Sequence, residues 1–266
     1  MKTLFQYRVP LAGSLFALIV TLVVAELTTA AVQQKEARVT QVIKDVRLLP
    51  SGASPKPASI NDFVRSGMAV RTGIDSRTEL TFADQSLTRL GANSVFSFSE
   101  GGKNFDLSSG ALLICVPKET TPTQVKVGAA TAAVTGFTAM FEHHSNGWSK
   151  MIMLNGNGTI SFRGVAGEPC ELQQGQMVVW PPHPVRCPEI LNVDLSKVLK
   201  GKLIQDFPPL PEIEEILKNI DNPPPGGPPI DPTNIDTRDQ GANAMPTPIK
   251  TGSGFPGLRR RPTNRP

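Results

Sequence analysis

Short segments in which apolar and polar residues alternate recur between Gly67 and Trp180, and this pattern constrains the fold more than any other feature. In one of them, Val125 and Val127 flank Lys126. The other segments are centred on Leu80–Phe82, Phe96–Phe98, Phe137–Phe141 and Ile160–Phe162. A two-residue period directs one set of side chains into a core and the other into solvent, as in half-buried β-strands. The central part of the chain is therefore predicted to be all-β.

Turn-forming residues separate these strands, as at Gly101–Asn104, Ser145–Gly147 and Asn155–Gly158. Asn-Gly pairs readily adopt the positive φ angles that tight hairpins need. No long segment with a helical period lies between the turns. The expected fold class is therefore mostly β, with a single β-roll, solenoid-like or sandwich-like domain, and periodicity alone leaves these architectures open.

One or two short helices are expected after the strands. Asp194 can cap the N-terminus of a helix that ends at Gly201. A second helix is predicted over Pro211–Ile220, where apolar residues form one stripe. The stripe consists of Ile213, Ile216, Leu217 and Ile220. We expect it to pack on the β-domain; binding of a partner protein is the alternative.

The last segment, residues 222–266, is rich in proline and glycine and has almost no large apolar residues. Such a segment cannot bury enough surface to offset its ordering entropy, so a disordered tail is predicted. Its Arg259–Arg261 run is the only dense basic cluster, and the whole chain has a net charge of only +4. Nucleic-acid binders concentrate basic residues on a face or a helix, so no nucleic-acid partner is expected.

The first 31 residues have the three-part order of a secretory signal peptide. Lys2 and Arg8 precede an uncharged apolar run, Leu11–Ala25, and the small residues Thr28–Ala31 follow it. We expect cleavage near Thr29–Ala31 and export to the periplasm or cell envelope, or secretion. An uncleaved membrane anchor and a buried core helix are the alternatives.

Export changes the interpretation of the three cysteines, because disulfides persist in oxidising compartments. Cys170 and Cys187 bracket a short segment and are predicted to form a disulfide, whereas Cys115 lies in an apolar run and is expected to be buried. The alternative is that all three thiols are free and buried. A zinc site is disfavoured because there is no C-x-x-C motif and His183 is the only nearby imidazole.

No catalytic arrangement stands out in the sequence. His143 and His144 are adjacent in a predicted strand and should point to opposite faces, which makes them a poor ligand pair. Asp75, Asp84 and Asp106 lie in or beside predicted turns, where aspartate commonly bonds the backbone. Motifs of a nucleophile elbow, a zinc protease and a phosphate loop are missing. We therefore predict no enzyme, no catalytic residue, no metal and no cofactor.

Four consecutive motifs resemble the FecR-domain family. They are GMAVRTG from Gly67, SRTEL from Ser76, FADQSL from Phe82 and RLGANS from Arg89. The resemblance continues through Phe105–Gly110 and into Val125–Gly136. It implies an all-β, roll-like or solenoid-like domain outside the cytoplasmic membrane. The best-known members of that family relay a signal from an outer-membrane transporter to a cytoplasmic sigma factor.

The residues that carry the resemblance are interpreted as structural. Three are turn glycines and four are core positions: Gly73, Gly91 and Gly110, and Leu80, Phe82, Leu87 and Leu90. Only ten residues precede the apolar run at Leu11. We therefore expect no cytoplasmic domain of the kind that contacts a sigma factor, and no relay by this chain alone.

These observations predict an exported, non-enzymatic FecR-like binding or scaffold module of the cell envelope, with a protein or envelope component as partner. A membrane-anchored sensor or signalling component is the first alternative, and an envelope glycan-active enzyme is the second. The expected segments are residues 1–31, a signal peptide; 32–64, a strand and loop; 65–190, the β-domain; 191–221, helical; and 222–266, the tail.

Overall fold

The computed structural model describes residues 36–99, 104–118, 123–134, 136–220 and 224–232, all within the compact unit Lys35–Pro266. The predicted signal peptide, residues 1–31, lies outside the described residues, and so does most of the predicted tail. No helix in the described ranges is long and apolar enough to cross a membrane.

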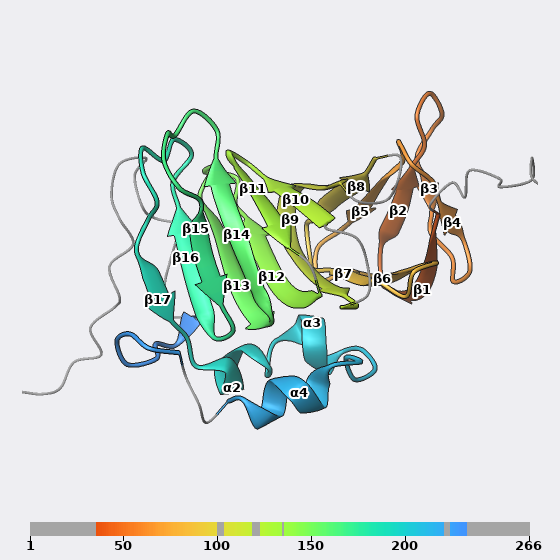
Figure 1. Ribbon diagram of the computed structural model, residues 1–266. Helices are drawn as coiled ribbons and strands as arrows, with labels where there is room; N and C mark the ends of the chain where they lie inside the picture. The colour runs from red at the N-terminus through yellow and green to blue at the C-terminus, as the bar shows by residue number, and fades with distance from the viewer. Residues whose placement is uncertain (1–35, 100–103, 119–122, 135, 221–223, 233–266) are drawn as a thin grey trace, which may run out of the picture. The chain divides into compact units, whose positions relative to one another are not determined.

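The described chain is mostly β, as predicted, with strands followed by short helices (Figure 1). The strands are β1 (Ala37–Ile43), β2 (Val46–Leu49), β3 (Lys56–Pro57), β4 (Phe63–Val64), β5 (Ala69–Thr72), β6 (Arg77–Phe82), β7 (Leu87–Leu90), β8 (Val95–Phe98), β9 (Asn104–Val116), β10 (Thr123–Val127), β11 (Ala130–Val134), β12 (Phe137–His143), β13 (Ser149–Asn155), β14 (Asn157–Phe162), β15 (Cys170–Gln173), β16 (Gln176–Trp180) and β17 (Ile190–Asn192). The helices are α2 (Leu195–Val198), α3 (Lys202–Gln205) and α4 (Ile213–Lys218).

The strand pairings form two sheets that share β9. Sheet A has the order β4-β1-β6-β7-β9-β12-β13-β16-β17. Sheet B has the order β3-β2-β5-β8-β9-β10-β11-β14-β15. All of these pairs are antiparallel except β9 with β10. Strands of the predicted segment 32–64 pair with those of the predicted β-domain, since β1 joins β6 and β2 joins β5.

Strand β9 passes from one sheet to the other at Gly110. Its first half pairs with β8 and β10 in sheet B, and its second half, from Gly110, pairs with β12 in sheet A. Gly110 has a φ of 87°, and a Cβ atom at this position would collide with Ser94. Glycine is therefore required where the strand changes sheets.

The main core lies between the two sheets and confirms the predicted alternation. Phe82 from sheet A packs edge-on against Phe98 from sheet B, with ring centroids 5.1 Å apart, and Phe105 lies 5.2 Å from Phe82. The inward residues of β10, β12 and β14 belong to the same core. Offset and edge-to-face aromatic contacts of this kind add to the free energy gained from burial.

A second core lies between sheet A and the three helices. Ile216 is fully buried in it, and Trp148 and Leu154 belong to the same cluster. Every residue of β13 is buried, because one face meets the inter-sheet core and the other meets the helices. The predicted packing of the Ile213–Ile220 stripe on the β-domain is thus observed, although Leu217 remains half exposed.

The helical segment differs in detail from the prediction. Asp194 caps α2 as expected, since its carboxylate accepts a hydrogen bond of 2.9 Å from the Ser196 amide. Helix α3, which lies between α2 and α4, has four residues and was not expected, because a single turn carries too little periodicity to be recognised.

The predicted tail begins later than residue 222. The amide of Ile230 donates to the carbonyl oxygen of Asn192 at 2.9 Å, and Asn192 Nδ2 donates to the carbonyl oxygens of Pro224 and Gly227. Residues 224–232 therefore lie against β17 and are held by bonds to the backbone and the side chain of Asn192, which a compositional argument does not detect.

Candidate functional site

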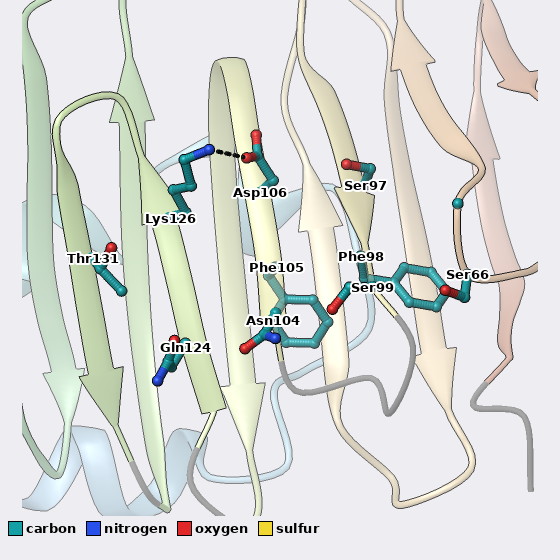
Figure 2. Close-up of a pocket in the computed structure, with 11 residues that line it drawn as sticks. Ser66, Ser97, Phe98, Ser99, Asn104, Phe105, Asp106, Gln124, Lys126 and Thr131 are labelled. Atoms are coloured by element: carbon teal, nitrogen blue, oxygen red, sulfur yellow. Dashed lines mark ion pairs between the residues drawn. The ribbon is translucent and has the colours of Figure 1, made fainter. Parts of the chain in front are cut away.

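The outer face of sheet B carries a shallow hollow of about 710 Å³, hereafter the sheet B groove. It is lined by Ser66, Gly67, Ser97, Phe98, Ser99, Asn104, Phe105, Asp106, Gln124, Lys126 and Thr131. Figure 2 shows these side chains on neighbouring strands, with Lys126 and Asp106 pointing toward each other. Most of them are the outward members of the alternating pattern, because Phe96 and Phe98 turn into the core on either side of Ser97.

The parallel pairing of β9 with β10 places the two charged residues of the sheet B groove next to each other. Asp106 lies directly opposite Lys126 in the register, and Lys126 Nζ lies 3.3 Å from Asp106 Oδ2. Both side chains are substantially exposed, so this ion pair contributes about 1 kcal/mol of stability or less. Asp106 was expected beside a turn; it lies within β9, because that strand is longer than the alternation indicated.

The chemistry of the sheet B groove is that of hydrogen bonding. Its side chains offer hydroxyls and amides, together with one paired acid and base. Phe98 and Phe105 form the floor but are only 3% and 2% exposed, so their ring faces are not available for stacking on a ligand. The groove is suited to a polar partner that can match alternating donors and acceptors.

Catalytic chemistry finds little support in this groove. Glycoside hydrolysis commonly needs two carboxyl groups on either side of the scissile bond, and among the described lining residues Asp106 is the only carboxylate. Within the described ranges, no group of three or more His, Cys, Asp or Glu residues could hold a metal ion.

The adjacent histidines diverge as predicted. His143 Nδ1 lies 2.8 Å from Ser149 Oγ, whereas His144 Nε2 lies 3.4 Å from Glu142 Oε2. Burial alone would raise the pKa of Glu142, but the charge of Lys150, 3.0 Å away, and the bond from His144 hold this pKa at about 2. Glu142 is therefore a structural anion and not a proton donor near neutral pH.

The fold brings together two imidazoles that the sequence separates by 40 positions. His143 and His183 line a second hollow of about 460 Å³, together with Arg163. His144 is not among its lining residues. No local sequence pattern predicts this proximity, because His183 reaches the hollow on a loop between β16 and β17.

The cysteines are placed as predicted. Cys170 and Cys187 form a disulfide with their Cα atoms 5.8 Å apart, and Cys115 is free and buried. Burial raises the pKa of the Cys115 thiol to about 11, with a hydrogen bond involving Thr138 acting in the opposite direction. Cys115 is therefore a core residue without nucleophilic character.

The residue that sequence reasoning missed is Arg89, which lies in the motif read only as structural turn and core. Its guanidinium is fully buried and lies 2.9 Å from Glu79 Oε2. It also donates to the carbonyl oxygens of Leu203 and Pro208, and it stacks 4.9 Å from the ring of Phe207. Arg89 thus joins β7 to the chain around α3. One sequence feature could have indicated this role: Glu79 and Arg89 carry opposite charges at paired positions of two apolar strands.

Further polar contacts hold the helical segment on sheet A. Arg77 Nε lies 2.8 Å from Asp206 Oδ2. Glu212 accepts hydrogen bonds of 2.9 Å from Thr138 Oγ1 and from Asn155 Nδ2. Helices α2, α3 and α4 thus lie over the outer face of sheet A (Figure 1). The outward side chains of sheet B that line the groove remain accessible.

Comparison with known proteins identifies the central strands. Residues 68–157 match the family model described as FecR protein, which confirms the predicted resemblance for this segment. No curated protein matches the chain.

Two solved structures are similar to part of this chain. Both are titled crystal structures of "a putative anti-sigma factor from Parabacteroides distasonis ATCC 8503", at 1.65 and 2.50 Å resolution. Their sequence identities are 13% and 14%, and both TM-scores are 0.41. Each match covers 50% of this chain and 65% or 64% of the other chain, which is less than two thirds of its length.

Proposed function

We propose that this chain is an exported, non-enzymatic binding module built on a FecR domain, and that it recognises a protein of the cell envelope through the sheet B groove. The observation that carries the proposal is the asymmetry of the two sheets. Helices cover the outer face of sheet A, while the groove on sheet B is open and polar. Nine of its eleven lining residues fall between Ser97 and Thr131, inside the segment that matches the family.

A protein partner fits the groove better than a sugar does. Sugar-binding sites commonly stack a ring on an exposed aromatic face, and the two phenylalanines of the floor are buried. An extended polar peptide segment presents regularly spaced donors and acceptors, which Ser97, Asn104 and Gln124 can match from three neighbouring strands. The Lys126–Asp106 pair offers one charge of each sign to such a segment.

Export is supported by two independent features. The first 31 residues have the composition of a signal peptide. The Cys170–Cys187 disulfide is of a kind that forms and persists in oxidising compartments.

Site-specific photo-crosslinking tests the binding surface. A photoreactive phenylalanine analogue at Ser97 or at Gln124, in the full chain expressed in its native cells, should give the same discrete protein adduct. The matched control places the analogue at Glu214, an exposed residue of α4 on the opposite side of sheet A. An identical adduct from Glu214, or none from both groove positions, would contradict the proposal.

A second candidate is a membrane-anchored signalling component, which the FecR match favours. The two candidates differ in the fate of residues 1–31. N-terminal sequencing of the mature protein should begin near Thr29–Ala31 if the chain is a released module. An intact Met1 terminus on protein that resists carbonate extraction from membranes would favour the second candidate.

A further inference from the structure

The hollow of about 460 Å³ described above lies where several loops converge at the ends of the strands, hereafter the loop-end pocket. The β10–β11 turn contributes Gly128, and the end of β12 contributes His143. Arg163 follows directly after β14, and His183 follows β16. Both sheets therefore contribute to one pocket, because β10 and β14 belong to sheet B and β12 and β16 to sheet A.

The lining of the loop-end pocket can carry positive charge only. Its described residues include one arginine and two of the three histidines of the chain, and no aspartate or glutamate is among them. The side chains of Arg163 and His183 make no hydrogen bond or ion pair with the rest of the described chain. An arginine beside two imidazoles is a common donor set for phosphate and carboxylate groups.

The imidazole of His143 is held in place and left open on one side. Its Nδ1 atom is bonded to Ser149 Oγ at 2.8 Å, so the ring has a fixed orientation. Nε2 has no partner among the described residues. A Cβ atom at Gly128 would lie 3.0 Å from Cε1 of His143, so glycine at this turn keeps the edge of the ring uncovered. Once the ring is protonated on both nitrogens, it can therefore donate from Nε2 to a ligand.

We infer that the loop-end pocket binds an oxyanion, either a phosphate or a carboxylate group, with Arg163, His143 and His183 as its donors. The planar guanidinium of Arg163 can donate two parallel hydrogen bonds to such a group. This inference does not depend on the proposed function, because none of the described residues lines both the loop-end pocket and the sheet B groove.

The surroundings of His143 make the binding depend on pH. Burial lowers the pKa of His143, the neighbouring charge of His144 lowers it further, and Asp106 on β9 raises it. In the empty pocket, with Arg163 and His183 also facing it, His143 is therefore mainly neutral at pH 7. A bound anion favours the protonated ring, so binding takes up a proton and the affinity rises as the pH falls.

The disulfide fixes the loop that carries His183. Cys187 follows the pocket residue Pro184 by three positions, and its partner Cys170 lies on β15 of sheet B. Reduction of this bond releases the loop from sheet B. The affinity of the pocket for the anion should then fall.

Three histidines in the whole chain give a direct measurement by NMR. Inorganic phosphate and, separately, acetate are titrated into the full chain at about pH 6, and the Cε1–H signals are followed. The signals of His143 and His183 should shift in a saturable manner, and the signal of His144, which lies outside the pocket lining and beside Glu142, should shift less. Saturation by phosphate alone assigns a phosphate site, and saturation by both ligands assigns a general carboxylate and phosphate site. Saturation by acetate alone assigns a carboxylate site.

Variants decide whether the named donors are responsible. Arg163→Gln should weaken binding about tenfold, since it removes a charge-assisted pair of bonds. The matched control is Arg71→Gln, which removes an exposed arginine from β5, outside the pocket, and should leave the affinity unchanged. Acetate keeps its charge between about pH 6 and pH 8, so its affinity should rise over that range as the pH is lowered. Equal effects of the two variants, shifts of all three histidines together, or no saturable shift would overturn the inference.

Discussion

The guanidinium of Arg89 donates a hydrogen bond of 3.1 Å to the carbonyl oxygen of Leu203, a residue 114 positions further along the chain. A second bond of 2.6 Å reaches the carbonyl oxygen of Pro208. Arg89 lies within the segment that matches the family, and its two acceptors lie in the helical segment. One side chain therefore joins the FecR strands to the helices that cover them.

Replacing Arg89 by methionine should destabilise the protein by about 3–5 kcal/mol, because Glu79 is then left buried without its partner. Urea unfolding followed by the fluorescence of Trp148 and Trp180 measures the change. Adding Glu79→Gln to this variant should recover part of the loss. Arg71→Met, at an exposed position, is the control and should change stability by about 0.5 kcal/mol or less. An Arg89→Met protein as stable as the parent would show that the buried pair is unimportant.

The role of Arg89 illustrates what the sequence could and could not predict. Its neighbours Thr88 and Leu90 fit an alternating strand, and the strand was predicted correctly. The carbonyl oxygens that accept its hydrogen bonds lie in the helical segment, more than 100 positions later, and no local sequence pattern links them to Arg89. Periodicity reports which face of an element is buried, but not which distant carbonyl lies opposite it.

Loss of the disulfide should lower the free energy of unfolding by about 3 kcal/mol, the chain-entropy value for a 17-residue separation. The variant carries alanine at both Cys170 and Cys187, and denaturant unfolding compares it with the oxidised parent. Dithiothreitol should destabilise the parent and leave the double variant unaffected. A parent indifferent to the reductant would show that the bond contributes nothing to stability.

Cys115 should resist alkylation in the folded protein at about pH 8, because burial holds the pKa of its thiol at about 11. Iodoacetamide followed by mass spectrometry of the intact chain should show no adduct under native conditions. One adduct per chain should appear in denaturant without reductant, since the other two cysteines are in the disulfide. Rapid modification of native protein would mean that β9 opens readily.

Acidification should destabilise the parent protein more than its Glu142→Gln variant. The pKa of Glu142 is lowered from 4.5 to about 2 in the folded state, so the carboxylate binds a proton more readily in the unfolded chain. Its contribution is therefore complete above about pH 5 and is lost as the pH falls toward 2, with a maximum of about 3 kcal/mol. Urea unfolding of both proteins at several pH values measures the difference. Parallel stability curves would show that Lys150 and His144 do not hold this charge.

The loop-end pocket also shows which features of a candidate site the sequence cannot predict. The divergence of His143 and His144 followed from the period of a strand and is observed. His143, Arg163 and His183 line one pocket because four strands end near each other and their loops converge there. Loop conformation is set by tertiary packing and, here, by the disulfide at Cys187, so the residue pattern alone could not place these side chains together.

Strand β9 belongs to both sheets, and this arrangement limits which fragments of the protein can fold. A fragment of residues 68–157 would keep β9 but would remove β1 from β6 and β16 from β13 in sheet A. It would also remove β2 from β5 and most of β14 from β11 in sheet B. Four unpaired strand edges would then be exposed, and such edges promote aggregation. Chimaeras and binding probes should therefore carry at least residues 36–232, although the recognisable family signature occupies less than half of that length.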